Sequence, residues 1–253
     1  MRMRHKPWAL PEMKQDDKFF ETPRGLKGKW QAEFGNDWPI DLEIGCGRGD
    51  FISDLADREP NRNYIAMDLK NEVLVYALRK VNDAELANVR ILSMKAEELD
   101  EVFAPGEIST VYINFANPWP KASQNKRRLT HTRFLSLYRL FLREDSIIQF
   151  KTDDEGLYAA SLEYFPEAGY EILYHTDDLP VDYPGNIQTE YESKFRDFGM
   201  PIYRIDARMA PVSEERMREL LEYKEKSRQR AGRRAWTNYR KQAGQEQDPD
   251  QLS

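Results

Sequence analysis

The first group of residues that could do chemistry is a glycine-rich loop with an acid in front of it. The segment Glu43-Ile-Gly-Cys-Gly-Arg-Gly49 stands between a predicted strand and a predicted helix. Glycines let the backbone turn sharply and approach a ligand closely. A dinucleotide-binding loop would have the spacing G-x-G-x-x-G, whereas this one has G-x-G-x-G with Glu43 two positions before the first glycine. The pattern suits S-adenosylmethionine (SAM), which has no phosphate and carries an ammonium group that a carboxylate can approach.

Asp68 supplies a second carboxylate that fits the same ligand. It ends the next predicted strand, about 20 residues after the glycine loop, where a carboxylate can accept hydrogen bonds from ribose hydroxyls. Each feature alone has a plainer explanation: a packing turn for the glycines and a solvated strand end for Asp68. Together they favour an adenosine-containing ligand, with nicotinamide cofactors as the rival.

A rigid segment follows a later strand and reads Asn114-Phe-Ala-Asn-Pro-Trp-Pro-Lys121. Its two prolines restrict the backbone and remove two hydrogen-bond donors, so Asn117 and Trp119 are held without a large entropy cost. In an open parallel sheet, ligands bind at the carboxyl ends of the strands. We therefore expect this segment beside the glycine loop, although a stiff loop with a packed Trp119 would also explain Pro-Trp-Pro.

Alternating strands and helices must position these groups. Apolar periodicity predicts strands over residues 40–44, 63–68, 89–92, 111–115, 146–151, 170–174 and 202–206. It predicts helices over residues 51–58, 71–82, 129–143 and 155–167. This order predicts an α/β, Rossmann-like fold with a mostly parallel seven-stranded sheet and helices on both faces.

The expected organisation has three parts. Residues 1–39 form a basic, irregular N-terminal segment, residues 40–210 the α/β domain, and residues 211–253 an extension. Ser213 can cap a helix at the start of the extension, and Gly244 to Ser253 are expected to be disordered. The extension either grips a polyanion through its basic residues or is a poorly ordered tail.

Composition narrows the class of protein and of partner. The chain has 253 residues, of which 40% are hydrophobic and 32% charged, which is typical of a soluble globular protein. Cys46 is the only cysteine, so neither an intramolecular disulfide nor a cysteine-based metal site is expected. There is no signal peptide and no membrane-spanning run, which favours the cytoplasm. The net charge is −6, yet residues 118–133 hold five basic residues and no acid, and residues 223–241 hold eight basic residues and one acid. Such segregated basic blocks are compatible with phosphate contact.

Several motifs in this order resemble the bacterial tRNA (guanine-N7)-methyltransferases of the Gram-positive type. The resemblance covers roughly residues 1–210. It rests on Met1-Arg-Met-Arg-His-Lys-Pro-Trp8, Lys29-Trp30, Phe34-Gly-Asn36, the Glu43 loop, Asn114-Phe115, Pro118-Trp-Pro-Lys121, Lys126-Arg-Arg-Leu-Thr130, Phe150-Lys-Thr-Asp153, Thr189-Glu-Tyr-Glu192, Lys194-Phe195 and Ile202-Tyr-Arg204.

This resemblance implies a class I SAM-dependent methyltransferase that modifies N7 of a guanine in the variable loop of tRNA, as a monomer or a homodimer. By position, it implies SAM binding by Glu43, Gly45, Gly47, Asp68, Lys95 and Asn117. It places the chemistry at Asn117 and Asp153, and the guanosine at Lys121, Asp153, Thr189, Glu190, Tyr191 and Glu192. RNA would lie along Ser123, Gln124, Asn125, Lys126, Arg127 and Arg128.

The sequence departs from the family pattern at three places. Asn117 stands where the family usually has Asp, Ala122-Ser123-Gln124 replaces the usual Lys-Arg-His, and Lys95 replaces an acid near the adenine. These departures suggest the alternative of a tRNA-binding protein with weakened catalysis. Asp153 is the expected carboxylate at the guanine, unless it only caps the helix that follows it. N7 has an in-plane lone pair and needs no strong base, so alignment and charge stabilisation suffice.

Overall fold

The computed structural model describes residues 5–222. These residues fall into two compact units, one that ends at Pro211 and one that begins at Val212. None of the described helices is long and apolar enough to cross a membrane.

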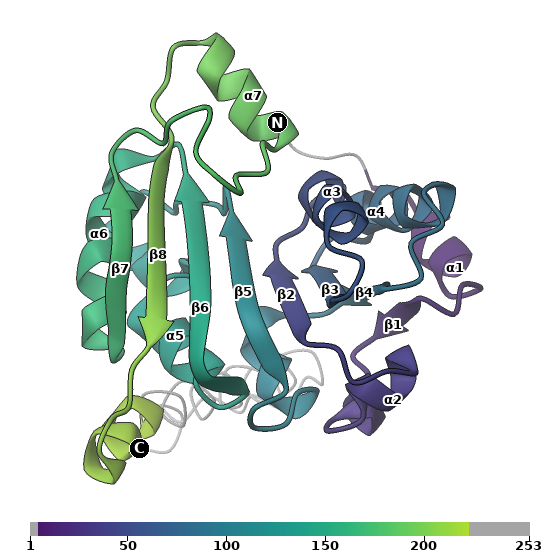
Figure 1. The fold of residues 1–253 in the computed structure, drawn as a ribbon, viewed down its shortest axis with the longest axis horizontal. Helices are drawn as coiled ribbons and strands as arrows, with labels where there is room; N and C mark the ends of the chain where they lie inside the picture. Colours follow the sequence, from purple (N-terminus) through teal and green to yellow (C-terminus); the bar gives the residue numbers. More distant parts are fainter. Residues whose placement is uncertain (1–4, 223–253) are drawn as a thin grey trace, which may run out of the picture. The chain divides into compact units, whose positions relative to one another are not determined.

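The first unit is built on one sheet of eight strands in the order β1-β4-β3-β2-β5-β6-β8-β7 (Figure 1). All neighbours are parallel except β8, which runs antiparallel to β6 and to β7. The strands are β1 Phe19–Glu21, β2 Ile40–Ile44, β3 Asn63–Asp68, β4 Val89–Ser93, β5 Ile108–Asn114, β6 Leu142–Thr152, β7 Tyr170–Thr176 and β8 Tyr203–Met209. The α/β class and the seven expected strands are confirmed. The unexpected eighth, β1, has three residues and pairs with β4 at the edge, too short a run to show alternation.

The four helices expected between the strands are present in the expected order, with one correction to their bounds, whereas α1, α2 and α7 were not expected. They are α1 Ala9–Met13, α2 Trp30–Phe34, α3 Asp50–Arg58, α4 Asn71–Asp83, α5 Thr132–Tyr138, α6 Glu155–Glu167 and α7 Glu190–Asp197, with 3-10 turns η1 Arg24–Leu26, η2 Ala96–Glu101 and η3 Ala122–Arg127. The helix expected over residues 129–143 was too long. It starts only after His131, whose ring nitrogen accepts from Arg133 N at 3.1 Å, and it ends because Leu142 already pairs with Ile108 in the sheet.

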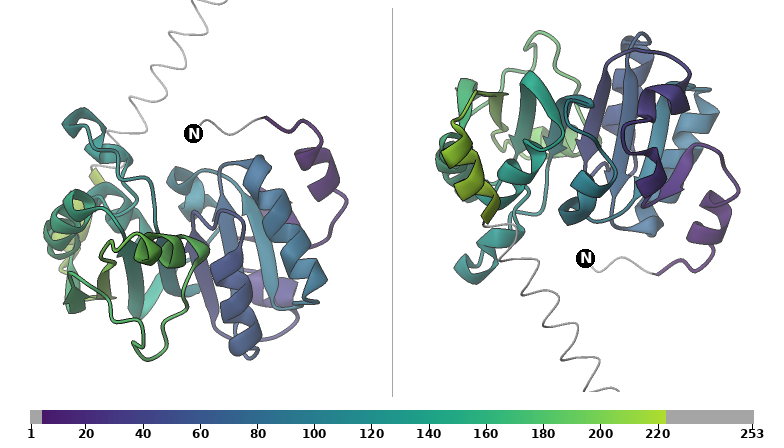
Figure 2. Two further views of the ribbon diagram at one scale, coloured as in Figure 1. Left: turned by 90° about the horizontal axis from the view of Figure 1, so that it is seen from above. Right: turned by 90° about the horizontal axis from the view of Figure 1, so that it is seen from below.

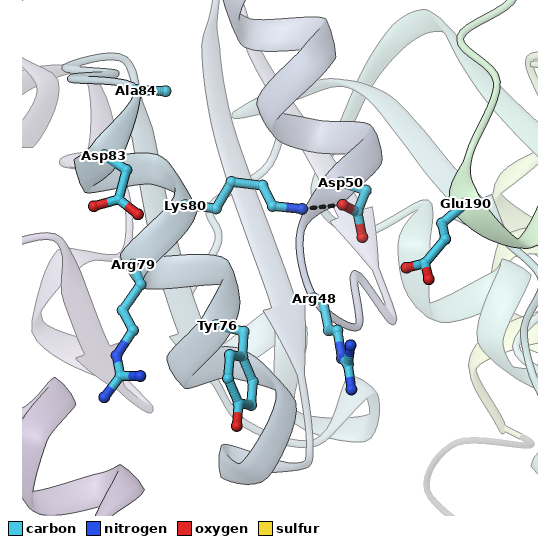
Figure 3. A pocket seen from close by; sticks show the side chains of 8 residues that line it. All are labelled: Arg48, Asp50, Tyr76, Arg79, Lys80, Asp83, Ala84 and Glu190. Carbon is cyan, nitrogen blue, oxygen red and sulfur yellow. Dashed lines mark hydrogen bonds and ion pairs between the residues drawn. The ribbon is translucent and has the colours of Figure 1, made fainter.

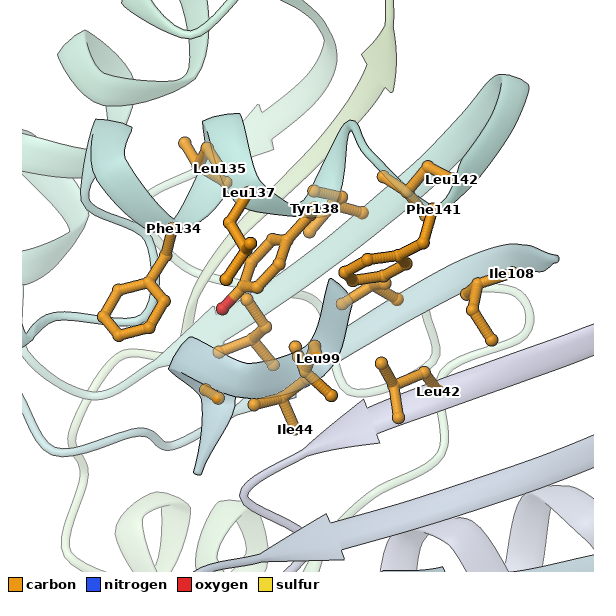
Figure 4. Packing of buried hydrophobic residues seen from close by; sticks show 14 of the residues in the cluster. Leu42, Ile44, Leu99, Ile108, Phe134, Leu135, Leu137, Tyr138, Phe141 and Leu142 are labelled. Carbon is orange, nitrogen blue, oxygen red and sulfur yellow. The ribbon is translucent and has the colours of Figure 1, made fainter. Parts of the chain in front are cut away.

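Helices cover both faces of the sheet (Figure 2). Along β3, Tyr64 and Ala66 belong to a buried cluster with α3 and α4, whereas Ile65 and Met67 belong to a cluster with α5 and α6. This alternation is the period of two that a strand imposes on its side chains. Figure 4 shows the second cluster, in which side chains of α5 pack over Leu42 and Ile44 of β2. Because both faces are buried, the parallel strands are held firmly, and the loops at their carboxyl ends have fixed starting points.

The N-terminal segment is more ordered than the sequence suggested, since it contains α1, β1 and α2. Its anchor is Trp30, which is fully buried and donates from its indole N–H to the carbonyl of Val102 at 2.9 Å. The Trp30 ring lies 5.6 Å from both Phe20 and Phe103, measured between ring centres. Residues 19–34 are therefore part of the same hydrophobic core as the sheet.

One glycine of the loop has a structural reason of its own. Gly49 has φ of +77°, and a Cβ there would lie 2.7 Å from Cβ of Ala77. The loop after β2 can therefore pass close to α4 only with glycine at this position. The plainer explanation of a packing glycine holds for Gly49, whereas a Cβ on Gly47 would meet nothing within 4 Å.

The second unit is described only at its beginning. Residues 214–222 are helical, and the Ser213 hydroxyl accepts from Arg216 N at 3.1 Å, as the predicted cap requires. The basic run over residues 223–241 and the expected disorder of residues 244–253 lie outside the described residues.

Candidate functional site

The carboxyl ends of β2 and β5 bring a buried acid and an amide together. Glu43 of β2 is 2% exposed, and its Oε1 accepts from the Asn114 side-chain amide at 3.1 Å. Its other oxygen, Oε2, is buried and has no hydrogen-bond partner among the described residues. Burial raises the pKa of Glu43 to about 7, although the Asn114 bond and the charge of Lys151 oppose the shift. A buried acceptor left open in this way fits a cationic donor from a ligand.

The glycine loop lies between this acid and Asp68, as expected. The Gly47 amide donates to Asp68 Oδ2 at 3.2 Å, and the Lys70 amide donates to Oδ1 at 2.9 Å. The amides of Gly45 and Cys46 both donate to the carbonyl of Met67, at 2.8 and 2.9 Å. Burial raises the pKa of Asp68 against these backbone bonds. The loop is thus tied to the ends of β2 and β3 with one carboxylate at each end.

Lys95 starts from the same edge but points elsewhere. It lies two residues after the end of β4, its side chain is 62% exposed, and its Nζ is 4.0 Å from Glu98 Oε1. Lys95 therefore follows β4, the neighbour of β3 in the sheet, but its side chain makes no contact with Glu43 or Asp68.

The segment after β5 has two bulky residues in the left-handed region. Phe115 has φ of +50° and Trp119 has φ of +46°, conformations that side chains of this size avoid. The Asn117 side-chain oxygen accepts from Trp119 N at 3.1 Å, and Phe115 N donates to the carbonyl of Lys151 at 2.9 Å. Asn117 itself is exposed. Such backbone persists only where the surroundings hold it.

Arg128 is one of the groups that hold this segment. It is 8% exposed, and its guanidinium donates to the carbonyl of Pro118 at 2.8 Å and to that of Trp119 at 3.4 Å. Arg127 lies outside, with its guanidinium 4.9 Å from the Trp119 ring centre. Of the six residues expected to contact RNA, Arg128 is therefore turned into the protein. Ser123, Lys126 and Arg127 are exposed on η3, and Gln124 and Asn125 are half-buried.

Helix α7 lies beyond the carboxyl ends of β5 and β6 (Figure 1) and is anchored by a buried glutamate. Glu192 is fully buried, and its two oxygens accept from Lys151 at 2.8 Å, Asn186 at 2.8 Å and Arg196 at 2.9 Å. Thr189 caps the helix by accepting from Glu192 N at 2.9 Å. Burial alone would raise the pKa of Glu192, but Lys151, Arg196 and Asn186 outweigh it, so the pKa lies below its ordinary value.

Three further residues of the expected guanosine site are exposed. Tyr191 is 60% exposed, and its ring lies 6.3 Å from both Phe115 and Phe195. Glu190 and Lys121 are exposed as well. The Phe115 contact joins α7 to the strained segment after β5.

Asp153 is not a helix cap. The cap of α6 is Asp154, whose Oδ1 accepts from Leu157 N at 2.6 Å. Asp153 is half-buried, and burial raises its pKa. The structural explanation considered for Asp153 therefore applies to its neighbour, and Asp153 is left for another role.

Lys151 and Asn114 lie in the motifs quoted from the sequence but were given no role there, although they link the site. Lys151 Nζ donates to Asn186, to the carbonyl of Ile187 and to Glu192, at 3.1, 2.8 and 2.8 Å. A lysine directly after the apolar Phe150, near the end of a predicted strand, was the available signal for Lys151. The residues around position 186 gave none, because they belong to an irregular loop.

Comparison with known proteins agrees with this geometry. A family model described as a putative methyltransferase matches residues 37–205. A tRNA (guanine-N(7)-)-methyltransferase of Clostridium acetobutylicum is 51% identical over 203 residues, which covers 80% of this chain and 96% of the relative. One of Clostridium botulinum is 50% identical over 216 residues, which covers 83% of this chain and 100% of the relative.

Solved structures show the same fold at low identity. An antibiotic-related methyltransferase has a TM-score of 0.53 at 19% identity, and covers 72% of this chain and 93% of its own. The 16S rRNA methyltransferase KamB has a TM-score of 0.54 at 16% identity, and covers 68% of this chain and 88% of its own. At this identity the similarity concerns the fold.

Replacing Glu192 by Gln tests the anchor of α7. We expect a loss of about 3 kcal/mol in the free energy of unfolding, because Lys151 would stay buried without its counter-charge. The pKa of Glu192 is lowered on folding, so its contribution is present above about pH 5 and is lost as the pH falls through the folded-state value. The difference between wild type and Glu192→Gln in urea unfolding should therefore narrow below pH 5. Glu190→Gln, an exposed change in the same helical turn, is the control, and an equal loss in both variants would contradict the anchor.

Proposed function

Because this chain belongs to the family of the tRNA (guanine-N7)-methyltransferases, we propose that it transfers the methyl group of SAM to N7 of a guanine in the variable loop of tRNA. The observation that carries the proposal is the open Oε2 of Glu43, buried between the glycine loop and Asn114. A positively charged donor would complete the hydrogen bonding of this oxygen, and the ammonium group of SAM is such a donor.

The cofactor would be held by the loops at the ends of β2, β3 and β5. Glu43 would accept from the ammonium group, Asp68 from the ribose, and the backbone at Gly45 and Gly47 would leave room for the chain of the cofactor. Asn117 would face it from the segment after β5. Bound SAM supplies an electrophilic methyl group on a sulfonium. Lys95, paired loosely with Glu98, would be at most a peripheral contact.

The remaining groups would bind and orient the guanine. Asp153, which caps no helix, would lie near the ring that gains positive charge, where a carboxylate is stabilising. The exposed residues Glu190, Tyr191 and Lys121 would meet the base, and Thr189, which is buried as the cap of α7, would support this turn. Glu192 differs from the expected role, because its oxygens already accept from three side chains. We infer that it positions α7 and that Glu190 is the carboxylate of this turn that is free to meet the base.

The RNA would reach the site along η3. Its exposed basic residues Lys126 and Arg127 fit phosphate contacts that add affinity and salt dependence. Arg128 would act indirectly, by fixing Pro118 and Trp119. An activity on tRNA would place the protein in the cytoplasm.

Incubation of the protein with labelled SAM and unmodified tRNA tests the proposal. We expect label in the tRNA and strand cleavage at one 7-methylguanosine in the variable loop. A weakened tRNA-binding protein would bind the tRNA without incorporating label, and label at another base would contradict the assignment of N7.

Asn117→Asp tests the departure from the family pattern. An Asp can still accept from Trp119 N, so the turn is kept while a negative charge is added near the purine. We expect kcat to rise about tenfold, which corresponds to ~1.4 kcal/mol of added transition-state stabilisation. Asn61→Asp adds the same charge at an exposed position before β3 and should leave kcat unchanged. No gain, or a loss, in Asn117→Asp would contradict the reasoning.

A further inference from the structure

A surface of alternating cations and aromatic rings lies beside the glycine loop. We define it as Lys6, Trp8, Arg48, Tyr76 and Arg79. Lys6 Nζ lies 4.0 Å from the Tyr76 ring centre and 5.8 Å from that of Trp8. The Arg48 guanidinium lies 5.3 Å from the Tyr76 ring, and that of Arg79 lies 5.1 Å from the Trp8 ring. Three separate parts of the sequence thus build one surface.

The surface borders a pocket of about 580 Å³ between α4, the glycine loop and the start of α7 (Figure 3). Arg48 and Tyr76 line it, together with Lys80 and Glu190. Arg48 is the residue between Gly47 and Gly49, and Glu190 belongs to the expected guanosine site. The pocket therefore continues the proposed active site outwards, toward Trp8.

Of the cations around this surface and pocket, two form ion pairs with acidic side chains. Arg79 makes a bidentate pair with Glu12, at 2.7 and 2.8 Å, and Lys80 pairs with Asp50. By contrast, Lys6 bonds to the Tyr76 hydroxyl and lies 3.5 Å from the carbonyl of Glu72, which are neutral groups. Within residues 5–222, neither Lys6 nor Arg48 has an acidic side chain within ion-pair distance.

Packing of the N-terminal segment does not explain the exposed ring. Ala9 and Met13 are fully buried against the cluster that contains α4, and they fasten the segment. Trp8 is 43% exposed although it directly precedes the buried Ala9. A tryptophan left open beside cations is a platform on which a nucleic-acid base can stack.

We propose that this surface is a second tRNA contact, which holds nucleotides next to the target guanine. A base stacks on Trp8, and phosphates lie at Lys6 and Arg48. The inference rests on the proposed function, since it assumes a tRNA substrate. It predicts RNA contact on both sides of the cofactor loop, at η3 and at the surface around Tyr76.

Trp8→Leu and Trp38→Leu form the matched test, since both tryptophans are similarly exposed, at 43% and 37%. Trp38 precedes β2 and so lies at the amino end of this strand, whereas the glycine loop follows its carboxyl end. With a fluorescein-labelled tRNA transcript, anisotropy should show binding weakened about tenfold in Trp8→Leu, from the loss of one stacked base. Tyr76→Leu should weaken it as well, and Trp8→Phe should retain most of the affinity. The KM for tRNA should rise while kcat at saturating tRNA and the Kd for SAM stay at the values of Trp38→Leu.

A charge variant gives an independent readout. Arg48→Gln should lower the slope of log Kd against log salt by about one, as expected for one phosphate contact. Arg58→Gln, an exposed change at the far end of α3, should leave the slope as in wild type.

Three outcomes separate the second tRNA contact from the proposed function. They require that 7-methylguanosine is mapped in parallel in tRNA treated with the wild-type protein. If wild type methylates N7 and Trp8→Leu binds tRNA as tightly as Trp38→Leu, only the second contact is wrong. If binding depends on Trp8 and Tyr76 but no 7-methylguanosine forms, the contact stands and the proposed function falls. If wild type binds no tRNA, both are overturned.

Discussion

The site depends on one buried carboxylate. Glu43 lies at the end of a strand that is buried on both faces, and a charge there loses most of its hydration. The Asn114 amide donates to Oε1, whereas Oε2 has no hydrogen-bond partner within residues 5–222. Burial therefore raises the pKa of Glu43 to about 7, so that its protonated and ionised forms coexist near neutral pH in the free protein. A cation bound at Oε2 would stabilise the carboxylate form of Glu43, as the proposed SAM site requires.

A second buried charge connects this acid to the substrate side. Lys151 lies near the end of β6 and favours the charged form of Glu43 through space, while its ammonium bonds directly to Glu192 of α7. Glu192 in turn holds Arg196 and Asn186, so the helix carrying Glu190 and Tyr191 is fastened to the strand that precedes Asp153. The contact between the rings of Phe115 and Tyr191 joins the segment after β5 to the same helix. Removing a partner from such a pair leaves an uncompensated buried charge, so the loss of either residue should destabilise the fold.

The sequence predicted the order of strands and helices well, because periodicity and glycine positions report burial directly. It overestimated one helix, since nothing local shows that Leu142 pairs across the sheet with Ile108. Glu43, Asp68 and the rigid segment could be placed because each lies at the carboxyl end of a recognisable strand. The different roles of Arg127 and Arg128, or of Glu190 and Glu192, could not be predicted. Neighbouring residues of the same charge are indistinguishable in the sequence, and only the backbone conformation decides which of them is buried. Asp153 and Asp154 show the same limit at the start of α6.

Calorimetric titration of the protein with SAM, in buffers of different ionisation enthalpy at pH 7, tests the central claim most directly. With a pKa of about 7, Glu43 is partly protonated in the free protein. Pairing with the SAM ammonium should lower this pKa, so binding should release about half a proton at pH 7 and tighten as the pH rises through 7. Glu43→Gln should bind SAM at least about tenfold more weakly, since a charge-assisted bond is lost, and should show no such release. Equal affinity and an equal proton balance in the two proteins would contradict the account.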